Sequence, residues 1–288
     1  LAFLIAFGIK VPMWPVHTWL PDAHVEAPSS GSVILAAVLL KVGGYGMIRF
    51  LLPITPDAGF YLNNFLIPLS LVAIIYISFV AIAQQDMKKL IAYSSIAHMG
   101  FVTLGIFLVF NTIGQAQDIQ NISHIGLQGA IMQMLSHGLI SAGLFICIGI
   151  IYSRTKSRMI DDQSGIGQVM PVFSALMMFF LLANSGLPGT SGFVGEFMVL
   201  IAAIKNNIMY AVLASTTLVL AASYSLWLGK RVLFGEVNND NVASMKILRF
   251  DEFWPLLILA ILVILIGIKP DLLLNISEES SMNMIKII

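Results

Sequence analysis

Residues 171–203 read PVFSALMMFFLLANSGLPGTSGFVGEFMVLIAA, an apolar segment long enough to cross a bilayer but interrupted near its middle by Gly186-Leu-Pro-Gly-Thr-Ser-Gly192. Proline removes a backbone hydrogen bond and clashes with the preceding helical turn, so we expect the helix to break there. Within a membrane, the unpaired backbone groups of such a break are tolerated only beside protein or a water-filled cavity. The segment therefore predicts a membrane protein with a polar site at membrane depth.

A second interrupted segment lies at residues 1–20, where Pro12 and Pro15 break an apolar run. Paired broken helices in two halves of a chain point to inverted repeats, as in transporters. We expect residues 1–52 to be the last two helices of a first five-helix repeat and 61–229 to be a second repeat. Residues 230–288 are then a connecting loop, a final transmembrane helix and a short tail.

The first residues of the chain do not look like a natural N-terminus. Residue 1 is a leucine inside an apolar stretch, without the basic start of a signal peptide. We therefore expect the natural protein to extend further on the N-terminal side.

Composition supports a membrane protein, since 58% of the 288 residues are hydrophobic and 10% are charged. A soluble domain has about 25% charged residues, so a soluble enzyme is excluded. The formal net charge of +0 gives no general attraction to nucleic acid. The single cysteine, Cys147, excludes an internal disulfide and any cysteine-ligated metal or iron–sulfur cluster. No phosphate-binding glycine loop follows a strand, so we expect no cofactor and no metal in this chain.

The apolar runs predict an all-α, polytopic membrane protein of about eight transmembrane helices, because each run reaches roughly 20 residues. Basic residues gather near one set of helix ends, which by the positive-inside rule faces the cytoplasm or the mitochondrial matrix. An even number of crossings places both chain ends on the opposite face. The expected spans are 1–20, 31–52, 61–83, 90–110, 125–152, 171–203, 207–229 and 253–274.

Lys41 lies near the middle of the span 31–52. A lysine at a helix centre costs about 2.5–3.5 kcal/mol on insertion scales, so it points to a functional site. Gly43, Gly44 and Gly46 would let another helix or a water chain come close. The alternative is a structural ion pair.

Lys10 and Glu196 lie close to the two breaks. Free carbonyls at the first break can solvate Lys10, and Glu196 can take up and release a proton at membrane depth. Alternatively, Lys10 lies at the interface with a buried stem, and Glu196 holds a helix end.

His98 and His137 fall inside the spans 90–110 and 125–152. Histidine titrates near neutral pH, so both are candidate proton relays. The competing interpretation is a neutral ring bonded to a nearby serine. With Lys10, Lys41 and Glu196 they form the series of polar sites that a proton path needs. The serines in question are Ser94, Ser95, Ser136 and Ser141.

His17, Asp22, His24 and Glu26 cluster after the first break. Two histidines and two carboxylates suggest a metal, but their spacing across Pro21 does not place both histidines on one helix face. We favour capping and hydrogen bonding for this cluster.

Five stretches together resemble the antiporter-like membrane subunits of respiratory complex I, the NADH:quinone oxidoreductase. The resemblance covers essentially the whole chain and implies an antiporter-like inverted-repeat fold with two broken helices. It also implies that these are the seventh to fourteenth helices of a fourteen-helix subunit. The stretches are KVPMWPVHTWLPDAHVEAP from Lys10, GSVILAAVLLK from Gly31, LIAYSSIAHMGF from Leu90, SHGL from Ser136 and GLPGTSGFVGEF from Gly186.

The resemblance also implies residue roles. Lys10 matches the family's lysine before the first break, Lys41 the lysine of the next helix, His137 the histidine between them, and Glu196 the charged residue on the second broken helix. The family's carboxylate partner of Lys10 belongs to a helix upstream of Leu1. We add His98, so the candidate proton-translocating residues are Lys10, Lys41, His98, His137 and Glu196.

The implied function is proton translocation in a bacterial or mitochondrial inner membrane, coupled to electron transfer from NADH to quinone in other chains. NADH, FMN, iron–sulfur clusters and ubiquinone would serve the whole complex. The expected partners are other membrane subunits, including the antiporter-like chains 2 and 5, and the lipid bilayer. The alternatives are a subunit of a multisubunit Na+/H+ antiporter, which shares the fold, and a scaffold.

Overall fold

The computed structural model describes residues 1–112, 117–237 and 239–288, with the side chains of 112 and 117–121 outside the description. Within these ranges the regular secondary structure is helical, apart from an isolated bridge between Asp86 and Met159, and loops and turns join the helices. The prediction of an all-α protein is therefore confirmed. The helices are α1 (Ala2–Lys10), α2 (Trp19–Glu26), α3 (Ser29–Ile34), α4 (Leu40–Gly46), α5 (Leu52–Ile54), α6 (Pro56–Ile82), α7 (Met87–Phe107), α8 (Gln117–Thr155), α9 (Ile166–Val169), α10 (Pro171–Asn184), α11 (Ser191–Asn206), α12 (Ile208–Ser215), α13 (Thr217–Leu233), α14 (Asp240–Ala243), α15 (Phe250–Ile268) and α16 (Asp271–Ile287).

Short segments of other helix types complete this list. Two π-helical segments, η1 (Leu35–Leu39) and η2 (Met47–Leu51), join α3, α4 and α5 into one continuous helix. Two 3-10 segments, η3 (Leu108–Thr112) and η4 (Ile160–Asp162), extend α7 and interrupt the loop after α8.

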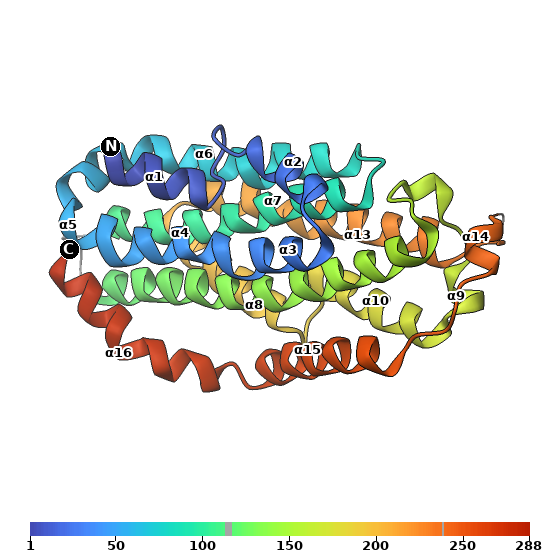
Figure 1. The fold of residues 1–288 in the computed structure, drawn as a ribbon. Coiled ribbons are helices and arrows are strands. Elements are labelled where there is room, and N and C mark those ends of the chain that lie inside the picture. Colours follow the sequence, from blue (N-terminus) through green and yellow to red (C-terminus); the bar gives the residue numbers. More distant parts are fainter. Residues whose placement is uncertain (113–116, 238) are drawn as a thin grey trace.

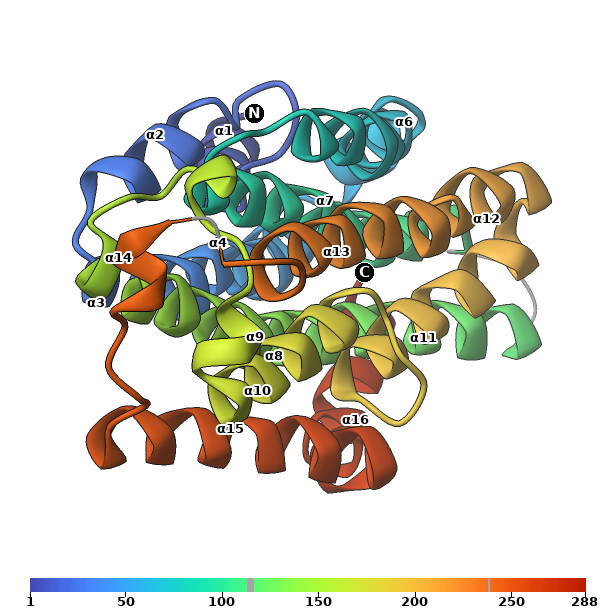
Figure 2. The same cartoon turned by 90° about the vertical axis from the view of Figure 1, so that its right-hand side faces the viewer.

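The helices form an elongated bundle with α7 at its centre (Figures 1 and 2). In an 18-residue window of the span that includes α7, 94% of the residues are buried, whereas in the span of α15 the corresponding share is 22%. Helix α15 lies along one edge of the bundle (Figure 1). Both chain ends lie at the same end of the bundle, opposite α9 and α14 (Figure 1). This agrees with the expectation from an even number of crossings.

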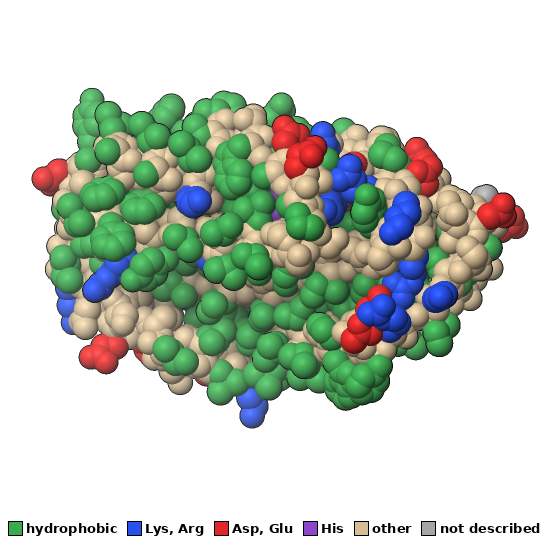
Figure 3. Space-filling model, viewed as in Figure 1, with side chains coloured by type: hydrophobic (Ala, Val, Ile, Leu, Met, Phe, Trp, Pro, Cys, Tyr) green, Lys and Arg blue, Asp and Glu red, His purple; other side chains and the backbone are tan. Residues whose placement is uncertain are grey.

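Six of the described helices are long and apolar enough to cross a membrane. They match six of the eight expected spans, and large hydrophobic side chains cover much of the molecular surface (Figure 3). An apolar exterior of this extent suits lipid rather than water. The chain is therefore a multi-pass membrane protein. The six are Ser29–Ile54, Pro56–Ile82, Met87–Asn111, Ile122–Thr155, Ile208–Leu233 and Phe250–Ile268.

The other two expected spans are interrupted where the prolines and glycines predict. Helix α1 ends at Lys10, and α2 starts only at Trp19. Helix α10 ends at Asn184, and α11 starts at Ser191. In the second break Gly186 has φ +77°, a left-handed conformation that glycine adopts without steric cost.

The last expected span, 253–274, was predicted to end too late in the sequence. Helix α15 stops at Ile268 because Pro270 disfavours helical backbone in the residue before it. The chain then continues as the 17-residue helix α16, where a short tail was expected. Gln128 of α8 donates a hydrogen bond to the Leu274 carbonyl at 3.2 Å, which ties α16 to the bundle.

Glycines of the Lys41 helix admit neighbouring helices, as the sequence predicts. A Cβ added at Gly43 would lie 2.7 Å from the backbone nitrogen of Val11, and one at Gly46 would collide with the Phe7 ring. A Cβ at Gly44 would meet Met134 of α8. These close approaches seat α4 against both α1 and α8.

Basic side chains concentrate toward one end of the bundle, on the right in Figure 3. Several of them bind carboxylates of other helices or loops. Arg154 and Glu252 join α8 to α15 at 2.6 Å, and Arg231 of α13 pairs with Asp161 of η4. Ion pairs thus fasten the loops at this end.

We expect Gly43→Val to push α1 away from α4 and to lower the free energy of unfolding by about 1–3 kcal/mol, the usual cost of overpacking. Gly8→Ala is the matched control, because its added Cβ lies 3.7 Å from Met13, an ordinary contact. Thermal unfolding of the purified protein measures both. Equal melting temperatures for the two variants would contradict the packing argument.

Candidate functional site

Lys41 and His137 form a direct pair between α4 and α8. The Lys41 ammonium lies 2.6 Å from His137 Nδ1 and 2.6 Å from the carbonyl oxygen of Ala36, so it can donate to both. Gly138 lets α8 come close to the Lys41 helix, since an added Cβ there would lie 3.0 Å from the Ala37 carbonyl oxygen. The His137 side chain is buried. A cation in the middle of the helix therefore has an imidazole acceptor, not a carboxylate.

His98 and Glu196 form a second pair between α7 and α11. His98 Nδ1 lies 2.7 Å from Glu196 Oε1, and both side chains are buried. The amide nitrogen of Gln133, on α8, donates to the same carboxylate oxygen at 3.0 Å. Three helices thus converge on one carboxyl group.

Tyr224 of α13 completes the surroundings of His98. Its hydroxyl lies 3.1 Å from His98 Nε2 and is buried. A tyrosine hydroxyl can donate to a neutral ring or accept from a protonated one. His98 therefore keeps a partner for Nε2 in either protonation state.

The two pairs meet through their imidazole rings. The centroids of His98 and His137 are 5.9 Å apart, and the ring planes are tilted by 44°. The described residues thus form a series from Lys41 through His137 and His98 to Glu196, carried by α4, α8, α7 and α11. A rotation of one ring or a bridging water can close the single gap in this series.

The second helix break borders this series. An added Cβ at Gly186 would lie 3.4 Å from Glu196 Oε2, so the carboxylate points at the interrupted backbone. Ser136 of α8 donates to the carbonyl of Ser191 at 2.8 Å, which fixes the start of α11. The break therefore places Glu196 at the end of the series.

The competing interpretation, histidines bonded to serines, is wrong for both rings. Ser94 and Ser95 each donate to the Ile91 carbonyl, and Ser141 donates to the backbone carbonyl of His137. Serine hydroxyls in a helix commonly donate a hydrogen bond to a backbone carbonyl of the preceding turn. Both His98 ring nitrogens and His137 Nδ1 instead have charged or phenolic partners from other helices, while His137 Nε2 has no hydrogen-bond partner among the described residues.

Lys10 lies apart from the series. Its side chain is exposed at the end of α1, and its Cβ packs beside Gly43. The structure gives it no hydrogen bond or ion pair with another described residue. Lys10 thus borders the first break, and its role stays a prediction.

The four residues that suggested a metal are separated. His24 is buried and stacked on Phe145, while Asp22 pairs with Lys89 at 3.6 Å. Across the residues that the structure describes, no three His, Cys, Asp or Glu side chains are placed to hold a metal ion. The expectation of polar bonding holds for Asp22 but not for the ring of His24, whose two nitrogens have no hydrogen-bond partner among the described residues.

Two residues of the site were not predicted from the sequence, Gln133 and Tyr224. Gln133 is a polar residue inside a long apolar helix, which is a usable signal. Tyr224 has no such signal, because tyrosine is common near helix ends in membranes. Only the packing of α13 against α7 brings its hydroxyl to His98.

Fold and site together define the class: a polytopic membrane protein of the antiporter-like fold, with paired titratable groups buried among its helices. The chain belongs to the family described as NADH:quinone oxidoreductase/Mrp antiporter, transmembrane region, whose model matches residues 1–222.

Individual relatives agree with this assignment. NADH-ubiquinone oxidoreductase chain 4 of Chondrus crispus is 47% identical over the whole chain and 56% of its own length. NADH-quinone oxidoreductase subunit M of Rhodobacter capsulatus is 47% identical over 99% of the chain and 53% of its own length. The chain thus spans about half the length of these curated relatives.

Solved structures show the same fold. A chain of respiratory complex I from Thermus thermophilus matches 99% of this chain and 57% of its own, with 31% identity and a TM-score of 0.88. A chain of the Mrp complex from Dietzia matches 99% of this chain and 59% of its own at 20% identity and a TM-score of 0.83, a likeness of fold alone.

We expect His98→Leu to lower the free energy of unfolding by about 3–5 kcal/mol, because it leaves the Glu196 carboxylate buried beside an apolar side chain. Glu196→Gln is the control, since its amide oxygen can still accept from His98 and Gln133. Melting temperatures of the purified variants measure the effect. The double variant His98→Leu/Glu196→Leu should recover part of the loss, and no recovery would contradict a buried pair.

Proposed function

We propose that this chain is a proton-translocating part of the membrane domain of NADH:quinone oxidoreductase, respiratory complex I. The observation that carries the proposal is the series Lys41, His137, His98 and Glu196, in which the two histidines and the glutamate are buried and Lys41 is partly buried. The two bonded pairs meet at their imidazole rings, whose centroids are 5.9 Å apart. Family membership and the similarity to chain 4 and subunit M support the choice of complex.

The geometry suits stepwise transfer. The Lys41 ammonium donates its proton along the 2.6 Å contact to His137 Nδ1, which leaves a neutral amine and a protonated ring. The ring then releases the proton on its other nitrogen toward His98. From His98 Nδ1 the proton reaches the Glu196 carboxylate, which becomes neutral. Each step moves one proton between groups whose burial makes a lasting charge costly.

We place the driving reaction in other chains. Electron transfer from NADH to quinone, with FMN, iron–sulfur clusters and ubiquinone as the cofactors of the whole complex, would change the charge near Lys41 or Glu196. Partners would be other membrane subunits, including the antiporter-like chains 2 and 5. Lys10 belongs to this proposal as a further proton site, one that needs a carboxylate partner from elsewhere in the complex.

The proposed organisation follows the two breaks. Counting the interrupted pairs α1–α2 and α10–α11 as one crossing each gives eight crossings in an inverted-repeat arrangement. Residues 1–52 would close a first repeat, 61–229 would form the second, and 230–288 would add the final transmembrane helix. The basic end would face the bacterial cytoplasm or the mitochondrial matrix, across the inner membrane.

The family description also includes Mrp antiporters, so exchange of Na+ for protons is the second candidate. Identity favours complex I, at 47% with chain 4 and subunit M against 20% with the Mrp chain. Sodium-dependent proton movement in vesicles without NADH would favour the antiporter.

We expect Lys41→Ala and Glu196→Gln, in the complete subunit, to lower the protons pumped per NADH several-fold. Lys41→Ala removes the first donor, and the amide of Glu196→Gln cannot take up a proton. Acidification of inverted vesicles alongside NADH oxidation measures the ratio. Lys205→Ala is the matched control, because it removes an exposed lysine from α11. Normal pumping by both site variants would overturn the proposal and favour a scaffold.

A further inference from the structure

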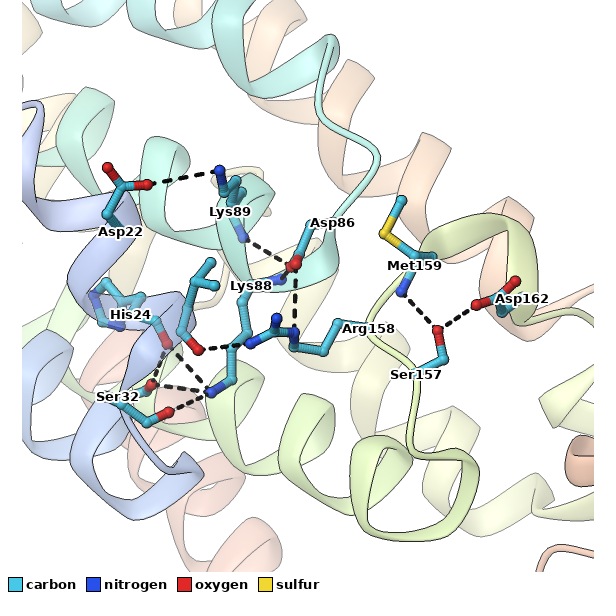
Figure 4. A network of polar contacts seen from close by, with 12 residues as sticks. Asp22, His24, Ser32, Asp86, Lys88, Lys89, Ser157, Arg158, Met159 and Asp162 are labelled. Atoms are coloured by element: carbon cyan, nitrogen blue, oxygen red, sulfur yellow. Dashed lines mark hydrogen bonds and ion pairs between the residues drawn. The ribbon is translucent and has the colours of Figure 1, made fainter.

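The C-terminal end of α2 is held by cations from two other parts of the chain (Figure 4). The Lys88 ammonium donates to the carbonyl oxygens of Ala27 at 2.8 Å and His24 at 3.2 Å. Arg158 donates to the Val25 carbonyl at 2.6 Å. Carbonyls at a helix C-terminus carry a partial negative charge, so these cations cap α2.

Lys88 is buried, and its direct partners are the two carbonyls and the Ser32 hydroxyl at 3.5 Å. The Asp86 carboxylate, at the start of the same helix, is engaged elsewhere. It accepts from the backbone nitrogen of Lys88 at 2.7 Å and pairs with Arg158 at 3.5 Å. A desolvated ammonium is unfavourable unless its surroundings compensate, so α2 and Lys88 stabilise each other in one position.

The side chain that α2 places by this contact is the His24 imidazole. The ring is fully buried and stacked on Phe145 of α8, with centroids 4.4 Å apart and planes within 8°. Neither ring nitrogen has a hydrogen-bond partner among the described residues. Leaving buried polar atoms unpaired lowers stability, a cost that a purely apolar ring stacked at this position would avoid.

The ring stacks on Phe145, which lies eight residues, or about 12 Å, further along α8 than His137, and Lys88 donates to the His24 carbonyl. His24 is thereby tied both to Lys88 and to the helix that carries His137 of the Lys41–His137 pair. We propose that His24 is a further proton-carrying residue of this path and that Lys88 positions it by capping α2. The inference rests on the proposed function and deepens it.

In the proposed step, one ring nitrogen of His24 accepts a proton that enters from water at the basic end of the molecule. The other nitrogen releases its proton toward the neutral amine of Lys41, which becomes an ammonium. The ring is neutral before and after, so charge and protons balance. An imidazole with both nitrogens free is suited to this task, because it can accept and donate at once.

The first test replaces His24 in the complete complex, in inverted membrane vesicles. His24→Phe keeps a ring to stack on Phe145 but has no nitrogen, and we expect several-fold fewer protons per NADH for each assembled complex. If His24→Phe does not assemble, His24→Gln gives the same comparison with a polar side chain that cannot carry a proton. Normal pumping by the assembled variant would overturn the role of His24.

The second test separates positioning from general stability. Lys88→Met removes the buried cap, whereas Lys89→Met removes the neighbouring lysine, whose partner Asp22 is exposed. We expect Lys88→Met to lower the protons per NADH, Lys88→Arg to restore most of them, and Lys89→Met to match the parent. A loss of assembled complex with an unchanged ratio would make Lys88 merely structural and overturn its positioning role.

The Lys41→Ala variant keeps the two proposals apart. If Lys41→Ala and Glu196→Gln both pump normally, the proposed function itself fails. If these two variants are impaired while His24→Phe is not, only the role of His24 fails.

Discussion

The cost of an unpaired charge in a membrane is the constraint on which this structure depends. Lys41 lies in the middle of a transmembrane helix, and its ammonium must find acceptors there. It finds them in the Ala36 carbonyl and the His137 ring. Because these acceptors belong to its own helix and to α8, the two helices are held in one register. The glycines after Lys41 allow that close approach by admitting α1 and α8.

The same constraint explains why the second polar pair lies beside a helix break. Glu196 needs several donors when it is ionised, and His98 and Gln133 come from two different helices to supply them. The interruption between α10 and α11 lets the carboxylate reach the backbone of Gly186. Breaking a helix at membrane depth is costly unless protein or a water-filled cavity adjoins it. Here α8 and α15 pack against parts of the break, through the hydrogen bond from Ser136 to the Ser191 carbonyl and the close approach of Gly267 to Gly189, while residues 187–189 are exposed. The break and the buried carboxylate therefore depend on each other.

Much of this arrangement follows from residue types and their order. The apolar runs, the prolines at 12 and 15 and the glycines around Pro188 predict the helices and both interruptions. Lys41, His98, His137 and Glu196 stand out because ionisable residues are rare inside apolar segments. Lys10 stands out for the same reason, and its side chain is exposed beside the first break without a hydrogen bond or ion pair to the described residues. The end of α15 and the helix α16 were missed, because a proline-terminated span and a polar amphipathic tail carry weaker hydrophobic signals.

What the sequence by itself determined is the class of protein, the helices with their breaks, and a short set of charged residues, all of which are local properties of the chain. Only the tertiary structure decided which side chains these charged residues contact. It showed that His98 faces Glu196 and Tyr224, that His137 faces Lys41, and that Lys88 caps α2 beside His24. Such pairings join residues distant in the chain, and their geometry is set by how the helices cross. Hydropathy and spacing along a single helix carry no information about those crossings.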